Sequence, residues 1–188
     1  MKKLLVLCLS AVLAVSLAAC GGGAGEEAGD LPPNNEAVSE LTPEERKANA
    51  EKVDGVYSVA AKLSRNYYDI LAEKLEALDG PEGSLVDVYA TCDDVIHYLK
   101  GFSEHLDTVE DEAAAAYKEA VNNYISNIRL IAYDAQDFID TADYSKAARM
   151  QEGIELMGYC ENQILTERTN YLTAAGFSPD EIEKLLAE

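Results

Sequence analysis

The sequence has no tryptophan, only three phenylalanines and two histidines, and far fewer basic than acidic residues. Fifteen lysines and arginines stand against 35 aspartates and glutamates, which gives a formal net charge of −20. Because such a chain repels phosphate backbones, we expect no nucleic-acid partner. Two histidines, neither in a Glu-x-x-His motif, also exclude the histidine and glutamate ligand set of di-iron helical proteins.

Motifs that carry specific chemistry are absent too. The chain contains no Gly-x-Ser-x-Gly elbow, no glycine-rich phosphate loop, no EF-hand loop and no Cys-x-x-Cys pair. The segment nearest to a metal motif, Asp94-Val95-Ile96-His97, occurs once, and its acid and histidine flank the apolar stripe of a predicted helix. We therefore expect a protein that is not an enzyme and that holds no metal and no other cofactor.

No apolar run reaches the roughly 20 residues that a transmembrane helix needs. The longest run extends from Leu4 to Leu17, directly after Met1-Lys2-Lys3. A short basic segment, an apolar run and then small residues are typical of a secretory signal peptide. The sequence therefore predicts that the chain is exported.

The end of this segment, Leu17-Ala18-Ala19-Cys20, resembles the lipobox of bacterial lipoproteins. The resemblance implies that residues 1–19 are a cleaved signal peptide and that Cys20 carries lipid. Acyl chains contribute about 0.8 kcal/mol per buried methylene, so two chains would anchor the protein durably. The resemblance thus implies an extracytoplasmic protein on the cell membrane, or on the outer membrane if the host has two membranes.

The residues that follow Cys20 are rich in glycine, proline and acid and show no periodicity. This composition is typical of a flexible linker. We expect residues 20–42 to be a lipidated linker that holds a folded domain, residues 43–188, clear of the membrane. Without its first 19 residues the chain keeps 13 basic and 35 acidic residues, a formal charge of −22.

From residue 43 onward, apolar residues recur at the three- and four-residue spacing of amphipathic helices. Thr42-Pro43-Glu44-Glu45 combines a capping hydroxyl, a proline and a glutamate at the third helical position, so it predicts a helix start. In the first helix the stripe includes Val56, Leu63 and Ile70. The predicted long helices span about residues 43–78, 85–106, 109–140 and 144–174.

Four amphipathic helices with short connections predict the fold class. We expect an all-α fold, specifically an antiparallel up-down-up-down four-helix bundle with a short C-terminal helix. At about 1.5 Å per residue, the third helix should exceed the second by roughly 15 Å. The hairpin of the third and fourth helices would then project away from the membrane, unless the third helix bends or ends early.

The tip of that hairpin is our predicted partner surface. It carries apolar side chains that would be only partly covered, namely Tyr133, Phe138, Ile139 and Tyr144. Tyrosine and phenylalanine are enriched at protein interfaces. We expect this surface to engage another envelope protein.

Charged residues interrupt the apolar stripes at Lys74, Glu161 and Arg168. Charges at such positions form buried ion pairs, lie near frayed helix ends or line a cavity. In a regular bundle Arg168 would lie level with Glu104 of the second helix. These residues support the alternative function, an extracytoplasmic module that binds or senses a small ligand in a pocket inside the bundle.

Cys92 and Cys160 are the cysteines of the predicted domain, in an extracytoplasmic setting that permits a disulfide. They should lie at the same height, but on helices across a diagonal of the bundle. Their Cα atoms would then be roughly 9 Å apart, beyond the usual limit of about 7 Å for a disulfide. A flattened bundle would permit the bond, so a disulfide and two buried thiols both stay open.

Overall fold

The computed structural model describes residues 41–188 except residues 79, 82 and 188. The predicted signal peptide, the lipidation site Cys20 and the linker up to residue 40 lie outside the described residues. Within them every regular element is helical, which confirms the all-α class. The elements are α1 (Pro43–Ala77), α2 (Leu85–Asp107), the short 3₁₀ helix η1 (Glu112–Ala114), α3 (Ala115–Thr141), α4 (Tyr144–Ala175) and α5 (Pro179–Ala187). None of the helices in this part of the chain is both long and apolar enough to span a bilayer.

The start of α1 confirms the predicted capping box. The Thr42 hydroxyl accepts a bond from the Glu45 amide at 3.2 Å, and the Glu45 carboxylate accepts one from the Thr42 amide at 2.9 Å. At the other end of the domain, Gly176 ends α4 with φ 97°, a left-handed conformation that glycine adopts without strain. The Ser178 amide then donates to the Glu181 carboxylate at 2.7 Å, and α5 begins.

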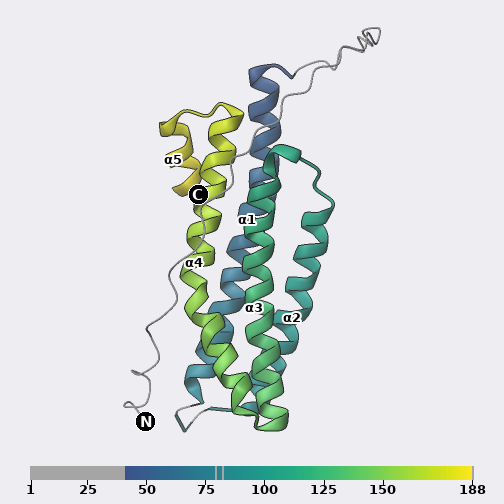
Figure 1. The fold of residues 1–188 in the computed structure, drawn as a ribbon, viewed down its shortest axis with the longest axis vertical. Helices are drawn as coiled ribbons and strands as arrows, with labels where there is room; N and C mark the ends of the chain where they lie inside the picture. Colours follow the sequence, from purple (N-terminus) through teal and green to yellow (C-terminus); the bar gives the residue numbers. More distant parts are fainter. Residues whose placement is uncertain (1–40, 79, 82, 188) are drawn as a thin grey trace, which may run out of the picture. The chain divides into compact units, whose positions relative to one another are not determined.

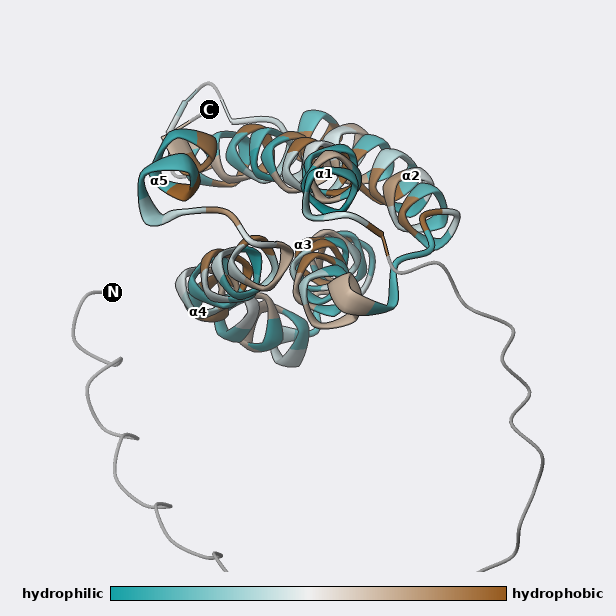
Figure 2. Cartoon of the chain, turned by 90° about the horizontal axis from the view of Figure 1, so that it is seen from above, coloured by the Kyte–Doolittle hydropathy of each residue, from teal (hydrophilic) through white to brown (hydrophobic). Residues whose placement is uncertain are grey.

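The four long helices lie in two pairs. In Figure 2, α1 and α2 form one row with α5, and α3 and α4 form the other row. Figure 1 shows the long helices side by side along most of their lengths. α1 contacts both α3 and α4, α2 contacts α3, and α5 packs against α4. Because α1 and α3 meet directly, they occupy a short diagonal and keep α2 and α4 apart.

Tyrosine rings are the large aromatic side chains of this core, since the chain has no tryptophan. The side chains of Tyr57, Tyr117 and Tyr124 are among the largest that are fully buried. The rings of Tyr57 and Tyr117 meet edge to face, with centroids 5.2 Å apart. This geometry brings phenolic hydroxyls into the interior, where each needs a hydrogen-bond partner.

The third long helix begins later than the sequence predicts, at Ala115 instead of residue 109. The Thr108 hydroxyl donates to the His105 carbonyl at the end of α2 and so does not cap a following helix. Asp111 caps the short helix η1, which precedes α3: its carboxylate accepts from the Ala113 amide at 2.9 Å and also from the Tyr171 hydroxyl at 2.7 Å. Residues 108–111 therefore form a connection that is fixed to α4.

The late start removes the predicted overhang. α3 has 27 residues and α2 has 23, so the excess is about 6 Å at about 1.5 Å per residue. The end of α3 instead lies beside the start of α2, where the Tyr89 hydroxyl donates to the Asp140 carboxylate at 3.4 Å. The hairpin of α3 and α4 therefore does not project past α2, and the prediction of a projecting tip was wrong.

Candidate functional site

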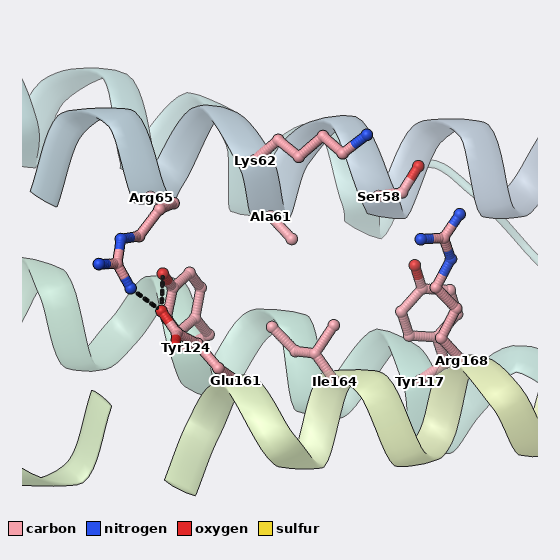
Figure 3. A pocket seen from close by; sticks show the side chains of 9 residues that line it. All are labelled: Ser58, Ala61, Lys62, Arg65, Tyr117, Tyr124, Glu161, Ile164 and Arg168. Atoms are coloured by element: carbon pink, nitrogen blue, oxygen red, sulfur yellow. Dashed lines mark hydrogen bonds and ion pairs between the residues drawn. The ribbon is translucent and has the colours of Figure 1, made fainter. Parts of the chain in front are cut away.

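A cavity of about 200 Å³ lies between α1, α3 and α4 (Figure 3). Three- and four-residue spacing places its lining side chains on one face of each helix. The lining consists of Ser58, Ala61, Lys62 and Arg65 from α1, Tyr117 and Tyr124 from α3, and Glu161, Ile164 and Arg168 from α4. Two of the residues that the sequence singled out, Glu161 and Arg168, therefore belong to this cavity. The third, Lys74, lies further along α1 and does not line it.

One end of the cavity holds Arg168, which belongs to a buried ion pair. Arg168 is 9% exposed, and its guanidinium donates two bonds to the Asp54 carboxylate, at 2.7 and 2.8 Å. A third bond of 2.7 Å reaches the Leu185 carbonyl, so this side chain joins α1, α4 and α5. The partner is therefore on α1, whereas Glu104 of α2 lies near Lys100 at 3.7 Å on the surface.

The opposite end of the cavity holds a second charged cluster. The Glu161 carboxylate accepts bonds from the Arg65 guanidinium and, at 3.2 Å, from the Tyr124 hydroxyl. Burial raises the pKa of Tyr124, and the Glu161 charge raises it further, so the phenol stays protonated as a donor. Arg65 also donates to Asp69 at 2.8 Å on its own helix. This end is therefore satisfied by its own partners.

Two polar groups of the lining are less well paired. The Tyr117 side chain is 1% exposed, and its hydroxyl lies against the Asp54 carboxylate without a hydrogen bond of standard geometry. Burial raises the pKa of Tyr117, and the Asp54 charge raises it further, so this group too remains a protonated donor. The exposed Lys62 forms no ion pair within the described part of the chain. Neither residue stands out in the sequence, because tyrosine and lysine are common on bundle helices.

A second candidate site is an apolar groove of about 440 Å³ between α1 and α2, which we call the α1–α2 groove. Its apolar walls are Val56, Val59, Ala60, Leu63 and Phe102. Val59 is 53% exposed and Leu63 is 39% exposed, and Ile70 continues the same edge of α1 at 48%. Our sequence interpretation placed Leu63 and Ile70 in the core stripe, but the structure exposes them, because α1 carries a second apolar stripe beside the buried one.

The residues of the predicted hairpin surface do not share one face. Tyr133 points outward from the middle of α3, away from its buried stripe. The rings of Phe138 and Tyr144 meet edge to face at 5.7 Å, and Tyr144 is 80% exposed. Ile139 is half-buried and lines a separate groove beside Leu85 of α2. A single partner would therefore contact only part of this set.

The two cysteines of the domain are free thiols in the structure. Cys92 is fully buried, and burial raises its pKa to about 12. Cys160 is half-buried, and burial raises its pKa as well. Their helices, α2 and α4, share no extensive contact, which is the geometry that argued against a disulfide.

Metal-binding side chains do not gather anywhere in the described residues, where no group of three histidines, cysteines or acids forms a metal site. The ring of His97 instead meets the ring of Tyr98 edge to face at 5.4 Å. Comparison with known proteins adds no family: no protein-family model matches the chain, and neither a curated protein nor a solved structure matches it significantly.

Proposed function

We propose that this protein is a surface-tethered lipoprotein whose non-enzymatic helical domain binds another envelope protein through the α1–α2 groove. The observation that supports this proposal most directly is the groove itself. Large apolar side chains along its edge stay half exposed although the domain has a filled core elsewhere. Contiguous apolar surface of this kind marks interaction sites, whereas scattered apolar residues do not.

The spacing along the groove suits an incoming helix. Val56, Val59, Leu63 and Ile70 follow one another at intervals of three, four and seven residues, the repeat of a helix-packing seam. On α2, Phe102 forms the opposite wall, and Tyr98 extends it with a ring stacked 5.2 Å from Tyr67. An amphipathic helix of the partner would place its apolar face between these walls.

Gly55 also lines the α1–α2 groove and is further evidence that a partner binds there. A side chain built at this position would meet nothing within 4 Å, so no contact inside the domain requires glycine there. Glycine inside a helix costs about 1 kcal/mol relative to alanine. This cost is offset if the backbone at Gly55, which lines the groove, is approached closely by a partner.

Charge favours a different protein over a second copy of this chain. Each mature chain would have a formal charge of −22, so two copies repel one another. A partner that presents basic residues around an apolar helix face would be attracted instead. This partner would meet the domain at the membrane, where lipid on Cys20 would hold it.

We further infer that the four long helices have the up-down-up-down arrangement. Short connections support it, since residues 78–84 join α1 to α2 and residues 142–143 join α3 to α4. In this arrangement α1 starts at the linker end and runs outward. The α1–α2 groove would then extend along the side of the domain, within reach of other proteins of the same membrane.

Partner capture with matched variants tests the proposal. The full chain, isolated from membranes of its own host after crosslinking, should carry a recurrent envelope protein that Leu63→Glu removes. Leu165→Glu is the control, because Leu165 of α4 is also exposed, at 49%, but lies outside the groove. Equal capture by both variants would refute the assignment of the groove. Capture lost only in Tyr144→Glu would place the partner on the α3–α4 hairpin instead.

A further inference from the structure

A separate apolar groove of about 350 Å³ lies between the start of α2 and the end of α3, and we call it the α2–α3 groove. In Figure 1 these two helix ends lie at the same end of the domain. Leu85 and Val86, in the first turn of α2, line the groove and are 54% and 77% exposed. Ile139 of α3 is half-buried beside them. The domain thus leaves large apolar side chains open to solvent at this groove.

Carboxylates stand next to these apolar walls. Asp93 lines the groove, and the Gln136 amide donates to its carboxylate at 2.6 Å and to the Tyr89 carbonyl at 3.3 Å. The Tyr89 hydroxyl donates to the Asp140 carboxylate at 3.4 Å. The Asp140 charge raises the pKa of Tyr89, and burial and the Asp93 charge raise it further. Both carboxylates therefore lie close to the same phenol of the groove.

The two carboxylates have no cation of their own. Asp137, the next acid on α3, pairs with Lys146 at 2.5 Å. Asp93 and Asp140, by contrast, form no ion pair among the residues of the described domain. The α1–α2 groove differs, because one lysine stands beside one glutamate in its lining. Negative charge next to exposed apolar surface is therefore left uncompensated at the α2–α3 groove.

From this arrangement we propose that the α2–α3 groove binds a cationic amphipathic peptide segment of another protein. An apolar side chain of the segment packs on Leu85, Val86 and Ile139. Lysine or arginine side chains next to it in the segment pair with Asp93 and Asp140.

Charge complementarity selects this occupant over others. A neutral apolar segment would cover the two carboxylates without supplying a counter-charge. An anionic lipid surface would be repelled by them, and so would a second copy of this acidic chain. A small amine would pair with the carboxylates but leave the apolar walls exposed. Only a segment with both kinds of side chain satisfies both features of the groove.

This groove is separate from the α1–α2 groove, with which it shares no lining residue. It uses the first turns of α2, whereas the α1–α2 groove uses Phe102 and His105 towards the other end of that helix. The proposal therefore goes beyond the partner function, and each can fail without the other.

Isothermal titration of the full chain in phosphatidylcholine vesicles tests the groove with three synthetic peptides. The probes are the acetylated and amidated peptides Lys-Leu-Lys-Leu-Lys, Gln-Leu-Gln-Leu-Gln and Lys-Ser-Lys-Ser-Lys, and vesicles without protein give the background. We expect the first peptide to bind and the other two to bind about tenfold more weakly, since one lacks the charges and the other the apolar side chains. Added salt should weaken binding of the first peptide.

Matched charge variants test whether the two carboxylates hold the peptide. Asp93→Asn combined with Asp140→Asn should weaken binding of Lys-Leu-Lys-Leu-Lys about fivefold or more, because two ion pairs are lost. Glu110→Gln combined with Glu112→Gln removes the same charge before the start of α3, at the far end of that helix, and should weaken binding much less.

Val86→Ser tests the apolar contact. Because Val86 is 77% exposed, this variant should melt close to the wild type, yet it should bind Lys-Leu-Lys-Leu-Lys about fivefold more weakly. Leu130→Ser is its control, since Leu130 of α3 is 56% exposed and does not line the groove. No binding of this peptide, equal affinity for its neutral analogue, or equal losses in the groove variants and their controls would overturn the proposal.

Discussion

Arg168 of α4 joins three helices, α1, α4 and α5. Its guanidinium reaches Asp54, 114 positions earlier in the chain, and the Leu185 carbonyl of α5. The pair is almost fully buried, so each charge depends on the other to offset the loss of hydration. Burial of this pair also explains how a polar group can occupy the apolar stripe of α4.

Breaking this pair one side at a time should be costly. We expect Arg168→Met to lower the free energy of unfolding by about 3–5 kcal/mol, because the Asp54 carboxylate would stay buried without a counter-charge. The double variant Asp54→Leu with Arg168→Met should recover most of that loss. Lys100→Met, which breaks an exposed pair with Glu104, should cost less than about 1 kcal/mol. Denaturant unfolding measures all three, and a double variant as unstable as the single one would contradict this account.

The thiols provide a second prediction for single residues. Cys92 should resist alkylation in the folded protein, because it is fully buried and its pKa is raised to about 12. Cys160 should react slowly, since it is only half-buried. In denaturant without reductant both should react. Mass analysis of the alkylated peptides checks this, and finding neither peptide modified in denaturant would indicate a disulfide.

At the residue level the sequence predicted part of the cavity. A charge on an apolar stripe is a visible anomaly, so Glu161 and Arg168 could be singled out. Asp54 could not be assigned as the partner, because that requires knowing which face of α1 meets α4. Tyr117 and Lys62 fit an ordinary helix pattern, and only the three-dimensional packing shows that Tyr117 is buried against Asp54.

Among the elements, the closest packing is between α3 and α4, and Gly153 permits it. A Cβ atom at this position would lie 2.7 Å from Cγ1 of Ile131, and the Asn127 amide donates to the Gly153 carbonyl at 2.8 Å. Gly55 of α1 is the matched case, a helical glycine with open space around it.

Alanine at these two glycines should act in opposite directions. Gly153→Ala should destabilise the domain by about 1–3 kcal/mol through overpacking. Gly55→Ala should stabilise it by about 0.5–1 kcal/mol, because alanine favours the helix and meets no atom. Denaturant midpoints measure both effects. If Gly55 borders the partner site, Gly55→Ala should also reduce partner capture although the domain is more stable.

The ion pair between Glu181 of α5 and Lys47 of α1 should stop stabilising the fold at acid pH. Bonds from the Ser178 amide and from Lys47 lower the pKa of Glu181 from 4.5 to about 2, and Lys47 lies 2.9 Å away on α1. A carboxyl whose folded pKa is lowered stabilises the fold above pH 4.5 and loses that contribution as the pH falls towards 2. The wild type should therefore melt higher than Glu181→Gln near neutral pH, and the difference should vanish at about pH 2. A difference that persists at low pH would contradict this linkage.

Helix identity and most helix ends were predictable from the sequence, because caps and apolar spacing act locally. The start of α3 was not, because the Asp111 carboxylate caps the short helix η1 before it and is fixed by a bond from the Tyr171 hydroxyl, 60 positions away. The second apolar stripe of α1 was also hidden. A repeat such as Val56, Leu63 and Ile70 looks the same whether a helix buries it in its own core or offers it to another protein.

At the scale of the whole molecule, the proposed function combines a predicted lipid anchor, an acidic domain and one apolar groove. The lipobox resemblance implies attachment at Cys20, and the acidic surface would discourage contact with phosphate headgroups and with other copies of the chain. The α1–α2 groove then offers apolar contact to a partner in the same membrane. Binding is therefore expected to depend both on attachment and on the groove.

Site-specific photo-crosslinking in intact host cells tests this central claim most directly. A photoreactive residue at position 63, in the groove, should join the chain to one recurrent envelope protein, and the same residue at position 165, which is more exposed on α4, should not. Blocking lipid attachment with Cys20→Ala should reduce the crosslink. A position 63 that yields no crosslink, or the same products as position 165, would contradict the proposal that this face binds an envelope protein.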